Sequence, residues 1–203
     1  MRKFETVVSK AVAWLMPNID TDAIAPMKRL ILNTDELGVY SFEPYRFVNG
    51  DGDAFVLNMD FPLNKPENRD ARILIAGDNF GCGSSRETAV QAIDKCGYRV
   101  IIASSFGGIF VKNCFMQGLL PIRLDRETVE DLARQSAEGG VFTVDLPAQE
   151  LTAPDGKKIP FEIEESRKEV LLGGLDEVYR TLNESEQYEA YLCRDRQLRP
   201  WLY

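Results

Sequence analysis

Between residues 72 and 146, short apolar runs alternate with longer segments whose apolar residues recur at helical spacing. This pattern predicts four strands separated by three helices. The expected strands are 72–76, 98–103, 119–124 and 141–146, and the expected helices are about 85–96, from Ser104 or Ser105 to about 117, and 126–137. Because strands and helices alternate with short connections, we expect parallel strands joined by right-handed crossovers in an α/β fold.

The N-terminal region carries a different pattern. Residues 4–15 are rich in β-branched side chains and predict one or two strands, which end at Pro17. The stretch 18–26 predicts a short extended segment with several acidic residues. Further along, Thr34 offers a helix start and Gly38 its end.

Beyond residue 146 the sequence predicts a hairpin and two helices. Asp155-Gly156, which lies between two short apolar stretches, is typical of a β-hairpin turn. The helices are expected at about 166–182 and 186–195, and Gly173-Gly174 offers a break in the first of them.

The glycine loop, which we define as Gly77–Gly83, follows the first of the alternating strands. Ser84 comes next and Glu87 lies three residues later, a spacing that predicts a capping box at a helix N terminus. In an open α/β sheet, ligands bind beyond the carboxyl ends of the strands. Because free N–H groups and the helix dipole favour an anion there, we expect an anion site at Ser84, Ser85 and Arg86.

The glycine spacing, G-x-x-x-G-x-G, differs from the dinucleotide fingerprint, and no Gly-Lys-Ser/Thr follows it as in a P-loop. The positive charge here is Arg86, whose planar guanidinium matches a carboxylate with two parallel hydrogen bonds. A tight strand-to-helix turn with a surface arginine is the structural alternative.

Composition limits the partners and the compartment. The chain has 203 residues, which suits one domain, and its net charge of −8 argues against nucleic acid as a partner. It contains no run of about 18 apolar residues, so we expect no membrane span. Its first residues lack the apolar core of a signal peptide, and we expect a cytoplasmic protein.

The cysteine and histidine content limits the chemistry. There is no histidine, so neither a Cys-His nor a Ser-His dyad can form within the chain. None of the four cysteines belongs to a C-x-x-C pair, so the sequence predicts no metal site and no cofactor held by this chain alone. Cys82 is expected to be a small loop residue, and Cys96 and Cys114 are expected to be core thiols on helices.

Three segments, taken together in their order and spacing, resemble one family. They are Asn18-Ile-Asp-Thr-Asp-Ala-Ile, the glycine loop with Ser84-Ser-Arg-Glu, and Ser105-Phe-Gly-Gly-Ile-Phe with Gly118-Leu-Leu-Pro-Ile. The combination is similar to the small subunits of 3-isopropylmalate dehydratase, which share the swivelling domain of aconitase. The resemblance implies one such domain over residues 1–203, an α/β fold with three β/β/α layers and a mainly parallel central sheet. A C-terminal helical elaboration is expected at about 164–203.

The resemblance also implies a function. Such a small subunit belongs to a hydro-lyase that isomerises 2-isopropylmalate to 3-isopropylmalate by dehydration and rehydration, in leucine biosynthesis. A separate large subunit carries a [4Fe–4S] cluster, and the enzyme is active only when both subunits assemble, as a heterodimer or heterotetramer. The substrate of this chain would then be a small 2-hydroxy diacid.

Site residues follow by position from the same resemblance. Ser84 is similar to the serine that acts as a base on a substrate C–H bond, and Arg86 is similar to the arginine that holds a substrate carboxylate. The further substrate contacts would be Ser85 and Arg29, and the supporting residues would be Asp22, Thr21 and Gly83.

Several alternatives stay open. From the residues alone, Asp20 and Asp22 suit simple loop capping, and Lys28 with Arg29 suits a solvated basic turn. Where the family usually continues with His-Ala, often followed by Pro-Trp, this chain has Thr88-Ala-Val-Gln. The alternative functions are therefore the small subunit of a related dehydratase for another 2-hydroxy diacid, such as a methyl-substituted malate or homocitrate, and a non-catalytic scaffold subunit.

Overall fold

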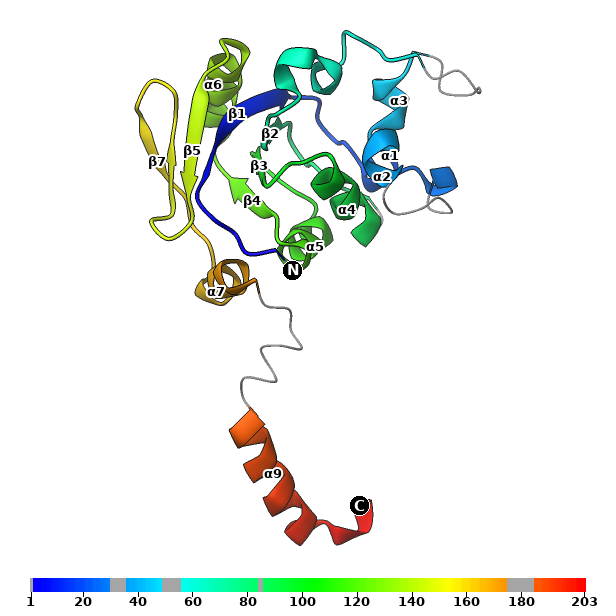
Figure 1. The fold of residues 1–203 in the computed structure, drawn as a ribbon, viewed down its shortest axis with the longest axis vertical. Helices are drawn as coiled ribbons and strands as arrows, with labels where there is room; N and C mark the ends of the chain where they lie inside the picture. Colours follow the sequence, from blue (N-terminus) through cyan, green and yellow to red (C-terminus); the bar gives the residue numbers. More distant parts are fainter. Residues whose placement is uncertain (1, 30–35, 49–55, 84–85, 175–184) are drawn as a thin grey trace.

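The computed structural model describes residues 2–29, 36–48, 56–83, 86–174 and 185–203. Its centre is a seven-stranded sheet with the strand order β4-β3-β2-β1-β5-β6-β7 (Figure 1). The strands are β1 (Val7–Trp14), β2 (Ile73–Ala76), β3 (Val100–Ala103), β4 (Leu120–Arg123), β5 (Val141–Asp145), β6 (Glu150–Thr152) and β7 (Lys158–Pro160). The four strands expected between residues 72 and 146 are all present.

The sheet is mixed, because β1 joins two halves that are paired differently. Its second half pairs in parallel with β2, with Ala11 opposite Ile73, and β3 and β4 continue this parallel half. Its first half pairs antiparallel with β5, with Val7 opposite Val144, and β6 and β7 continue that half. The α/β class is confirmed, but β5 runs antiparallel to its neighbour where the alternating pattern predicted a parallel strand.

Helices connect the strands. The longer helices are α4 (Glu87–Lys95), α5 (Gly108–Gln117), α6 (Arg126–Ala137), α7 (Glu165–Gly173) and α9 (Ser185–Leu198). The C termini of α4, α5 and α6 agree with the sequence prediction to within one residue. The shorter elements are α1 (Thr21–Ile24), α2 (Leu37–Tyr40), α3 (Glu43–Arg46), and the 3₁₀ turns η1 (Met27–Arg29), η3 (Pro62–Asn64), η4 (Pro66–Asn68) and η5 (Pro200–Leu202). The bounds of α6 are those predicted, and Gly97 and Gly118 follow α4 and α5 with positive φ, as expected.

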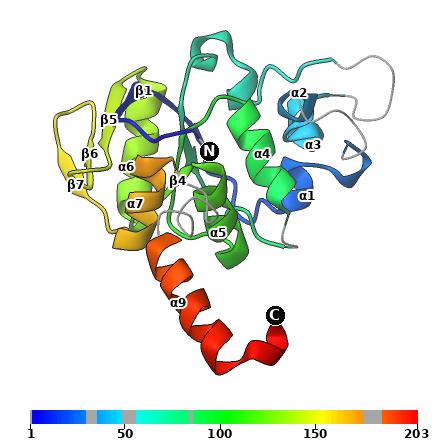
Figure 2. The same cartoon turned by 60° about the horizontal axis from the view of Figure 1, so that its bottom comes forward.

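Alternate residues of the parallel strands face two separate apolar cores. In β2, Ile73 and Ile75 belong to one core, whereas Leu74 and Ala76 belong to the other. Residues of α6 and α7 complete the first core, and residues of α1, α2 and α4 complete the second, so helices lie on both faces of the sheet (Figure 2). Because both faces are covered, the central strands β2 and β3 are continuously apolar and fully buried.

The predicted start of α4 was wrong. The helix begins at Glu87, and Arg86 is its N-cap, so Ser84 and Glu87 do not occupy the positions of a capping box. Ser84 and Ser85 lie outside the described residues.

The predicted start of α5 was also wrong, because the serines before it bond elsewhere. Gly107 is the N-cap of α5. The Ser104 hydroxyl donates to the Asp78 carboxylate, and Ser105 Oγ accepts a hydrogen bond from the Asn79 N–H at 2.8 Å. Both serines therefore hold the glycine loop instead of capping the helix.

Two predictions in the N-terminal region were wrong as well. Where an extended segment was expected, α1 forms, and its N-cap Asp20 accepts a hydrogen bond from the Ala23 N–H at 2.7 Å. Gly38 lies inside α2 rather than at a helix end. A Cβ atom at Gly38 would lie 2.9 Å from the Lys95 carbonyl oxygen, so this glycine lets α2 approach α4 closely.

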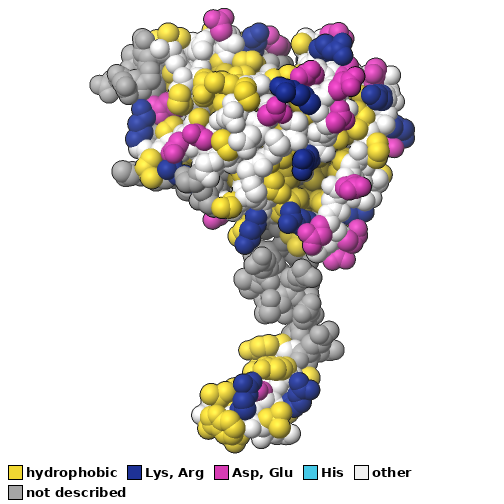
Figure 3. Space-filling model, turned by 180° about the vertical axis from the view of Figure 1, so that it is seen from behind, with side chains coloured by type: hydrophobic (Ala, Val, Ile, Leu, Met, Phe, Trp, Pro, Cys, Tyr) yellow, Lys and Arg dark blue, Asp and Glu magenta, His cyan; other side chains and the backbone are white. Residues whose placement is uncertain are grey.

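The C-terminal part contains the expected hairpin and helices. β6 and β7 pair antiparallel around Asp155-Gly156, and Gly174 ends α7 in the left-handed conformation, which confirms the predicted break. The remainder of the predicted helix 166–182, and the helix start predicted at Thr34, lie outside the described residues. α9 stands away from the sheet in Figure 1, and Figure 3 shows apolar side chains gathered at its far end. Among the described helices, none combines the length and the apolar character needed to cross a membrane.

Candidate functional site

The three segments singled out in the sequence lie side by side beyond the carboxyl ends of β1, β2 and β3. On one side of the glycine loop, the Gly81 N–H donates to the Ile19 carbonyl at 2.7 Å. On the other side, the Gly107 N–H donates to the Phe80 carbonyl at 2.9 Å. The three segments are therefore hydrogen-bonded in the same order as the strands that they follow, and the glycine loop is the middle one.

The glycines of this loop are required by its geometry. Gly81 and Gly83 have φ values of +70° and +89°, which side chains with a Cβ atom rarely adopt. A Cβ atom at Gly81 would overlap the ring of Phe110, and one at Gly107 would overlap the Gly81 carbonyl oxygen. The close approach fixes the loop against the start of α5.

Arg86, the residue before α4, forms an ion pair with Asp22 of α1. The Arg86 side chain is 15% exposed and the Asp22 side chain is 55% exposed, so the cation is more enclosed than the anion. Asp20 caps α1 and thereby fixes the turn that carries Asp22. Because a guanidinium has five N–H donors, this pairing leaves donors for a second carboxylate.

The other predicted site residues are placed unevenly. Thr21 is 2% exposed and begins α1, next to Asp22. A Cβ atom at Gly83 would lie 3.4 Å from the Asp20 side chain, so the end of the glycine loop touches the same turn. Arg29 is the last residue of η1. The structure thus brings Thr21, Asp22, Gly83 and Arg86 together.

The first turn of α4 holds an unpaired polar atom. In the described part of the chain, the buried Thr88 Oγ1 atom has no hydrogen-bond partner. On the exposed side of the same turn, Gln91 Nε2 donates to Glu87 Oε1 at 3.1 Å. Among the described residues, nothing bonds to the hydroxyl of Thr88, which is one of the departures from the family motif and lies two residues after Arg86.

Sequence reasoning missed a polar cluster at the same edge of the sheet. The Asp78 carboxylate accepts a hydrogen bond from Ser104 and forms an ion pair with Arg126 at 3.3 Å. Asn79 Nδ2 donates to Asn18 Oδ1 at 2.9 Å. The signal was available, because polar residues follow β1, β2 and β3, and the carboxyl ends of neighbouring parallel strands meet at one edge.

All four cysteines are free thiols. Cys114 is buried, which raises the pKa of its thiol and confirms the predicted core position. Cys82 is half-buried in the glycine loop. Cys96, the C-cap of α4, is half-buried and packs against the edge of the second core rather than inside it, and its Sγ lies 2.8 Å from Ser41 Oγ. Within the described ranges, no group of three or more His, Cys, Asp or Glu side chains is placed to hold a metal ion.

Comparison with known proteins identifies the family. Residues 1–127 match the aconitase C-terminal domain, and residues 130–165 match the LeuD family described as LeuD_N. The 3-isopropylmalate dehydratase small subunit of Rhodospirillum centenum is 45% identical to this chain, over 99% of this chain and 98% of its own. The chain belongs to the 3-isopropylmalate dehydratase small-subunit family. The family member from a Ruegeria species is 44% identical over the full length of both chains.

A solved structure extends the family likeness to the fold. The crystal structure of 3-isopropylmalate dehydratase from Methanocaldococcus jannaschii has a TM-score of 0.66 and 29% sequence identity. The match covers 90% of this chain and 99% of that one. The stretch that matches the aconitase domain contains β1 to β4 and all the predicted site residues.

Proposed function

We propose that this chain is the small subunit of a hydro-lyase that converts 2-isopropylmalate to 3-isopropylmalate by dehydration and rehydration, a step of leucine biosynthesis. Full-length membership of the family supports the proposal. The observation that carries it is the Arg86–Asp22 pair at the N terminus of α4, directly after Ser84 and Ser85. An arginine and a helix start together suit the carboxylates of a 2-hydroxy diacid.

The proposed enzyme is active only with a large subunit, as a heterodimer or a heterotetramer. The family resemblance assigns the [4Fe–4S] cluster to that large subunit, and the described part of this chain offers no group of side chains that fits it. We therefore assign substrate binding, orientation and proton transfer to this chain, with residues 1–203 acting as one swivelling domain.

Arg86 is proposed to hold a substrate carboxylate through the N–H donors that Asp22 leaves unused. The pairing with Asp22 sets the orientation of the guanidinium before the substrate arrives, which lowers the entropy lost on binding. The remaining assignments are Ser85 and Arg29 as substrate contacts and Thr21 and Gly83 as supporting residues.

Ser84 is proposed to accept the proton from the substrate carbon. The form of a serine that accepts a proton is its alkoxide, so a serine is a poor base unless its surroundings stabilise that form. Backbone N–H groups in the first turn of α4 can provide this stabilisation, because the Arg86 side chain does not cap them. The charge of Arg86 adds to it.

A second candidate function rests on Thr88. Its buried hydroxyl has no partner in the described part of the chain, so a substrate with a further polar group would gain a hydrogen bond there. This observation favours the related dehydratase for a more polar 2-hydroxy diacid over the scaffold subunit.

The test is reconstitution with the large subunit encoded by the same organism. We expect the isolated chain to be colourless and inactive, and the complex to interconvert the isopropylmalates. Ser84→Ala should lower turnover about 10²–10⁴-fold, the usual cost of losing a proton-transfer group. Because Ser84 is not the N-cap of α4, the free energy of unfolding of the Ser84→Ala chain should differ from that of the wild type by less than about 0.5 kcal/mol.

The matched control is Ser166→Ala, a serine on α7 away from the glycine loop, which should leave turnover unchanged. A folded Ser84→Ala complex with normal turnover would remove the assignment of the base. A complex that prefers another 2-hydroxy diacid to isopropylmalate would support the second candidate.

A further inference from the structure

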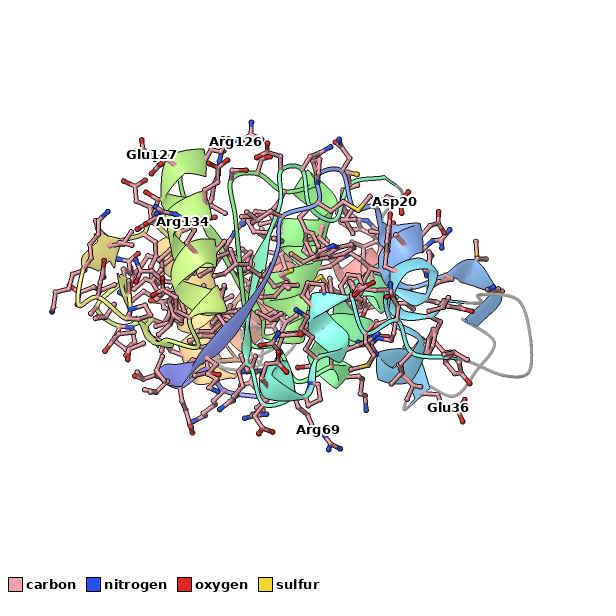
Figure 4. The ribbon with its side chains drawn as sticks, turned by 90° about the horizontal axis from the view of Figure 1, so that it is seen from above. Asp20, Glu36, Arg69, Arg126, Glu127 and Arg134 are labelled. Carbon is pink, nitrogen blue, oxygen red and sulfur yellow. The ribbon has the colours of Figure 1, made fainter. Side chains whose placement is uncertain are left out.

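A groove far from the glycine loop has a volume of about 570 Å³. Its walls come from α2, α3, η3, η4 and the C-terminal end of α4. The nine residues of α4 separate it from Arg86, which corresponds to about 13 Å at 1.5 Å per residue. In Figure 4, Arg69, which lines the groove, lies on the opposite side of the molecule from Asp20. The groove therefore lies apart from Arg86 and the glycine loop.

The lining of this groove is basic in a chain whose net charge is −8. The described residues that line it include Arg46, Lys65, Arg69 and Lys95, and none of these described lining residues is acidic. Lys95 lies in the last turn of α4, where a cation stabilises the carbonyl end of the helix. In the described ranges, Arg46, Lys65 and Arg69 have no carboxylate within ion-pair distance. The charge of these three side chains is left for a ligand.

The Arg46 guanidinium is fixed in place but not neutralised. Its Nη1 atom donates to the carbonyls of Gly38 at 2.6 Å and Val39 at 3.1 Å, and its Nη2 atom lies 3.7 Å from Cys96 Sγ. Its Nε atom is buried and, among the described residues, has no hydrogen-bond partner. A buried donor without an acceptor is unfavourable, and an anion that accepts from it would remove this cost.

Part of the groove is apolar. Val39 is 56% exposed and Leu57 is 48% exposed. Phe47 and Leu63 also belong to the lining. Ligand pockets commonly combine such apolar walls with a few fixed polar groups. A ligand that fills the groove would therefore place an apolar group against this wall and an acid group toward the arginines.

We propose that this groove binds a small organic anion, a carboxylate or a phosphate ester that also carries an apolar group. The proposal is independent of the reaction at Ser84 and Arg86. Arg46 also links the groove to α2, because it holds the Gly38 carbonyl.

The test is calorimetric titration of the full chain with phenyl phosphate, phenylacetate and inorganic phosphate. We expect phenyl phosphate or phenylacetate to saturate one site, and the tighter of the two identifies the acid group. Inorganic phosphate should bind more weakly, because it lacks the apolar group. In backbone NMR spectra, the amides of Val39 and Cys96 should shift while that of Glu87 should not.

Three variants locate the binding. Lys65→Gln combined with Arg69→Gln should weaken binding about tenfold, because one half-buried and one exposed charge contact are lost. The matched control, Lys112→Gln combined with Lys157→Gln, changes the net charge equally on exposed residues outside the groove and should bind as the wild type does. Arg86→Gln should also leave the affinity unchanged.

Absence of saturable binding into the millimolar range would overturn the proposal. So would equal weakening by the groove variant and its control, because the effect would then reflect net charge alone. Loss of binding in Arg86→Gln would place the anion at the glycine loop instead. Unfolding temperatures of all three variants show whether they are folded.

Discussion

At the residue scale, the candidate site contains an ion pair, Arg86 with Asp22, rather than a single cation. Arg86 is largely enclosed, and Asp22 shares its guanidinium before any substrate is present. In the proposed enzyme, a substrate carboxylate would therefore meet an arginine whose plane is already set. The functions of Arg86 and Asp22 are separable by conservative substitutions, because one supplies the fork and the other orients it.

Arg86→Lys should lower kcat/KM of the reconstituted enzyme about 10- to 100-fold, because lysine keeps the charge but loses the two parallel hydrogen bonds. Asp22→Asn should cost less, about 3- to 10-fold, mainly in KM, since asparagine still accepts a hydrogen bond. Steady-state kinetics of both complexes measure the difference. If Asp22→Asn lowers kcat/KM more than Arg86→Lys does, orientation of the guanidinium is not the role of Asp22.

Thr88→Val should raise the free energy of unfolding by up to about 1 kcal/mol, because it removes a buried hydroxyl that has no partner in the described part of the chain. Thr128 in the first turn of α6 is the matched control, since its Oγ1 donates to Asp125 Oδ2 at 2.7 Å. Thr128→Val should therefore lower the unfolding free energy by about 0.5–1.5 kcal/mol. Urea denaturation compares the two, and a loss of stability in Thr88→Val would show that its hydroxyl has a partner.

The sequence predicted which residues lie together at the candidate site, but it did not predict their partners. Arg86, Asp22, Thr21 and Gly83 were named from the motif resemblance, and the structure brings them together. The ion pair itself could not be predicted, because Asp22 was expected in an extended segment and the two residues are distant in the chain. It depends on α1, whose single turn is held by the Asp20 cap.

At the scale of elements, the glycine loop and the start of α5 interlock through their backbones. The Gly107 N–H donates to Phe80 on the loop, and the place of a Gly107 Cβ atom is taken by the Gly81 carbonyl oxygen. The neighbouring segments pack tightly against the loop and thereby restrict its conformation. The stability of the loop conformation therefore depends on the glycine loop and on the start of α5 together.

Gly107→Ala should lower the free energy of unfolding by about 1–3 kcal/mol, because the added methyl group must displace the backbone of the glycine loop. Gly108 is the ideal control, since a Cβ atom there has nothing within 4 Å. Gly108→Ala should be neutral or stabilise the chain by up to about 1 kcal/mol through helix propensity. Chemical denaturation tests the contrast, and equal effects at the two positions would contradict the interlock.

Helix ends show what local sequence can and cannot specify. Gly97, Gly118 and Gly174 were expected after helices or at a break, and each adopts the positive φ that ends a helix without help from other segments. Ser104 and Ser105 had the chemistry of helix caps but bond to the glycine loop. A serine cap competes with any nearby acceptor or donor, and those neighbours are set by the tertiary fold.

At the scale of the whole molecule, the segment from Met27 to Gly38 is a candidate for reading the substrate side group. Met27 is 60% exposed and follows α1, residues 30–35 lie outside the described part of the chain, and the Gly38 carbonyl accepts a hydrogen bond from Arg46 at 2.6 Å. Exchanging residues 27–38 for those of the Rhodospirillum centenum small subunit should change the ranking of 2-hydroxy diacids in kcat/KM. Exchange of the hairpin turn 153–157 is the control, and an unchanged ranking with both would place specificity elsewhere.

The direction of β5 could not be predicted from the strand pattern. The apolar run 141–146 marks a strand, but the same pattern fits a parallel or an antiparallel neighbour. In the structure, β5 pairs antiparallel with Val7–Lys10 of β1, whereas Ala11–Trp14 of β1 pairs in parallel with β2. The division of β1 between two partners is what turns an alternating sequence into a mixed sheet.

That division also governs the order in which the chain can fold as it is synthesised. β1 is made first, yet Val7–Lys10 has no partner until Val141–Val144 has left the ribosome. Pairing between such distant segments is slow, and an unpaired strand edge can join the edge of another chain. Aggregation is therefore favoured most during translation. A nascent chain that halts before β5 would expose the first half of β1 to other nascent chains.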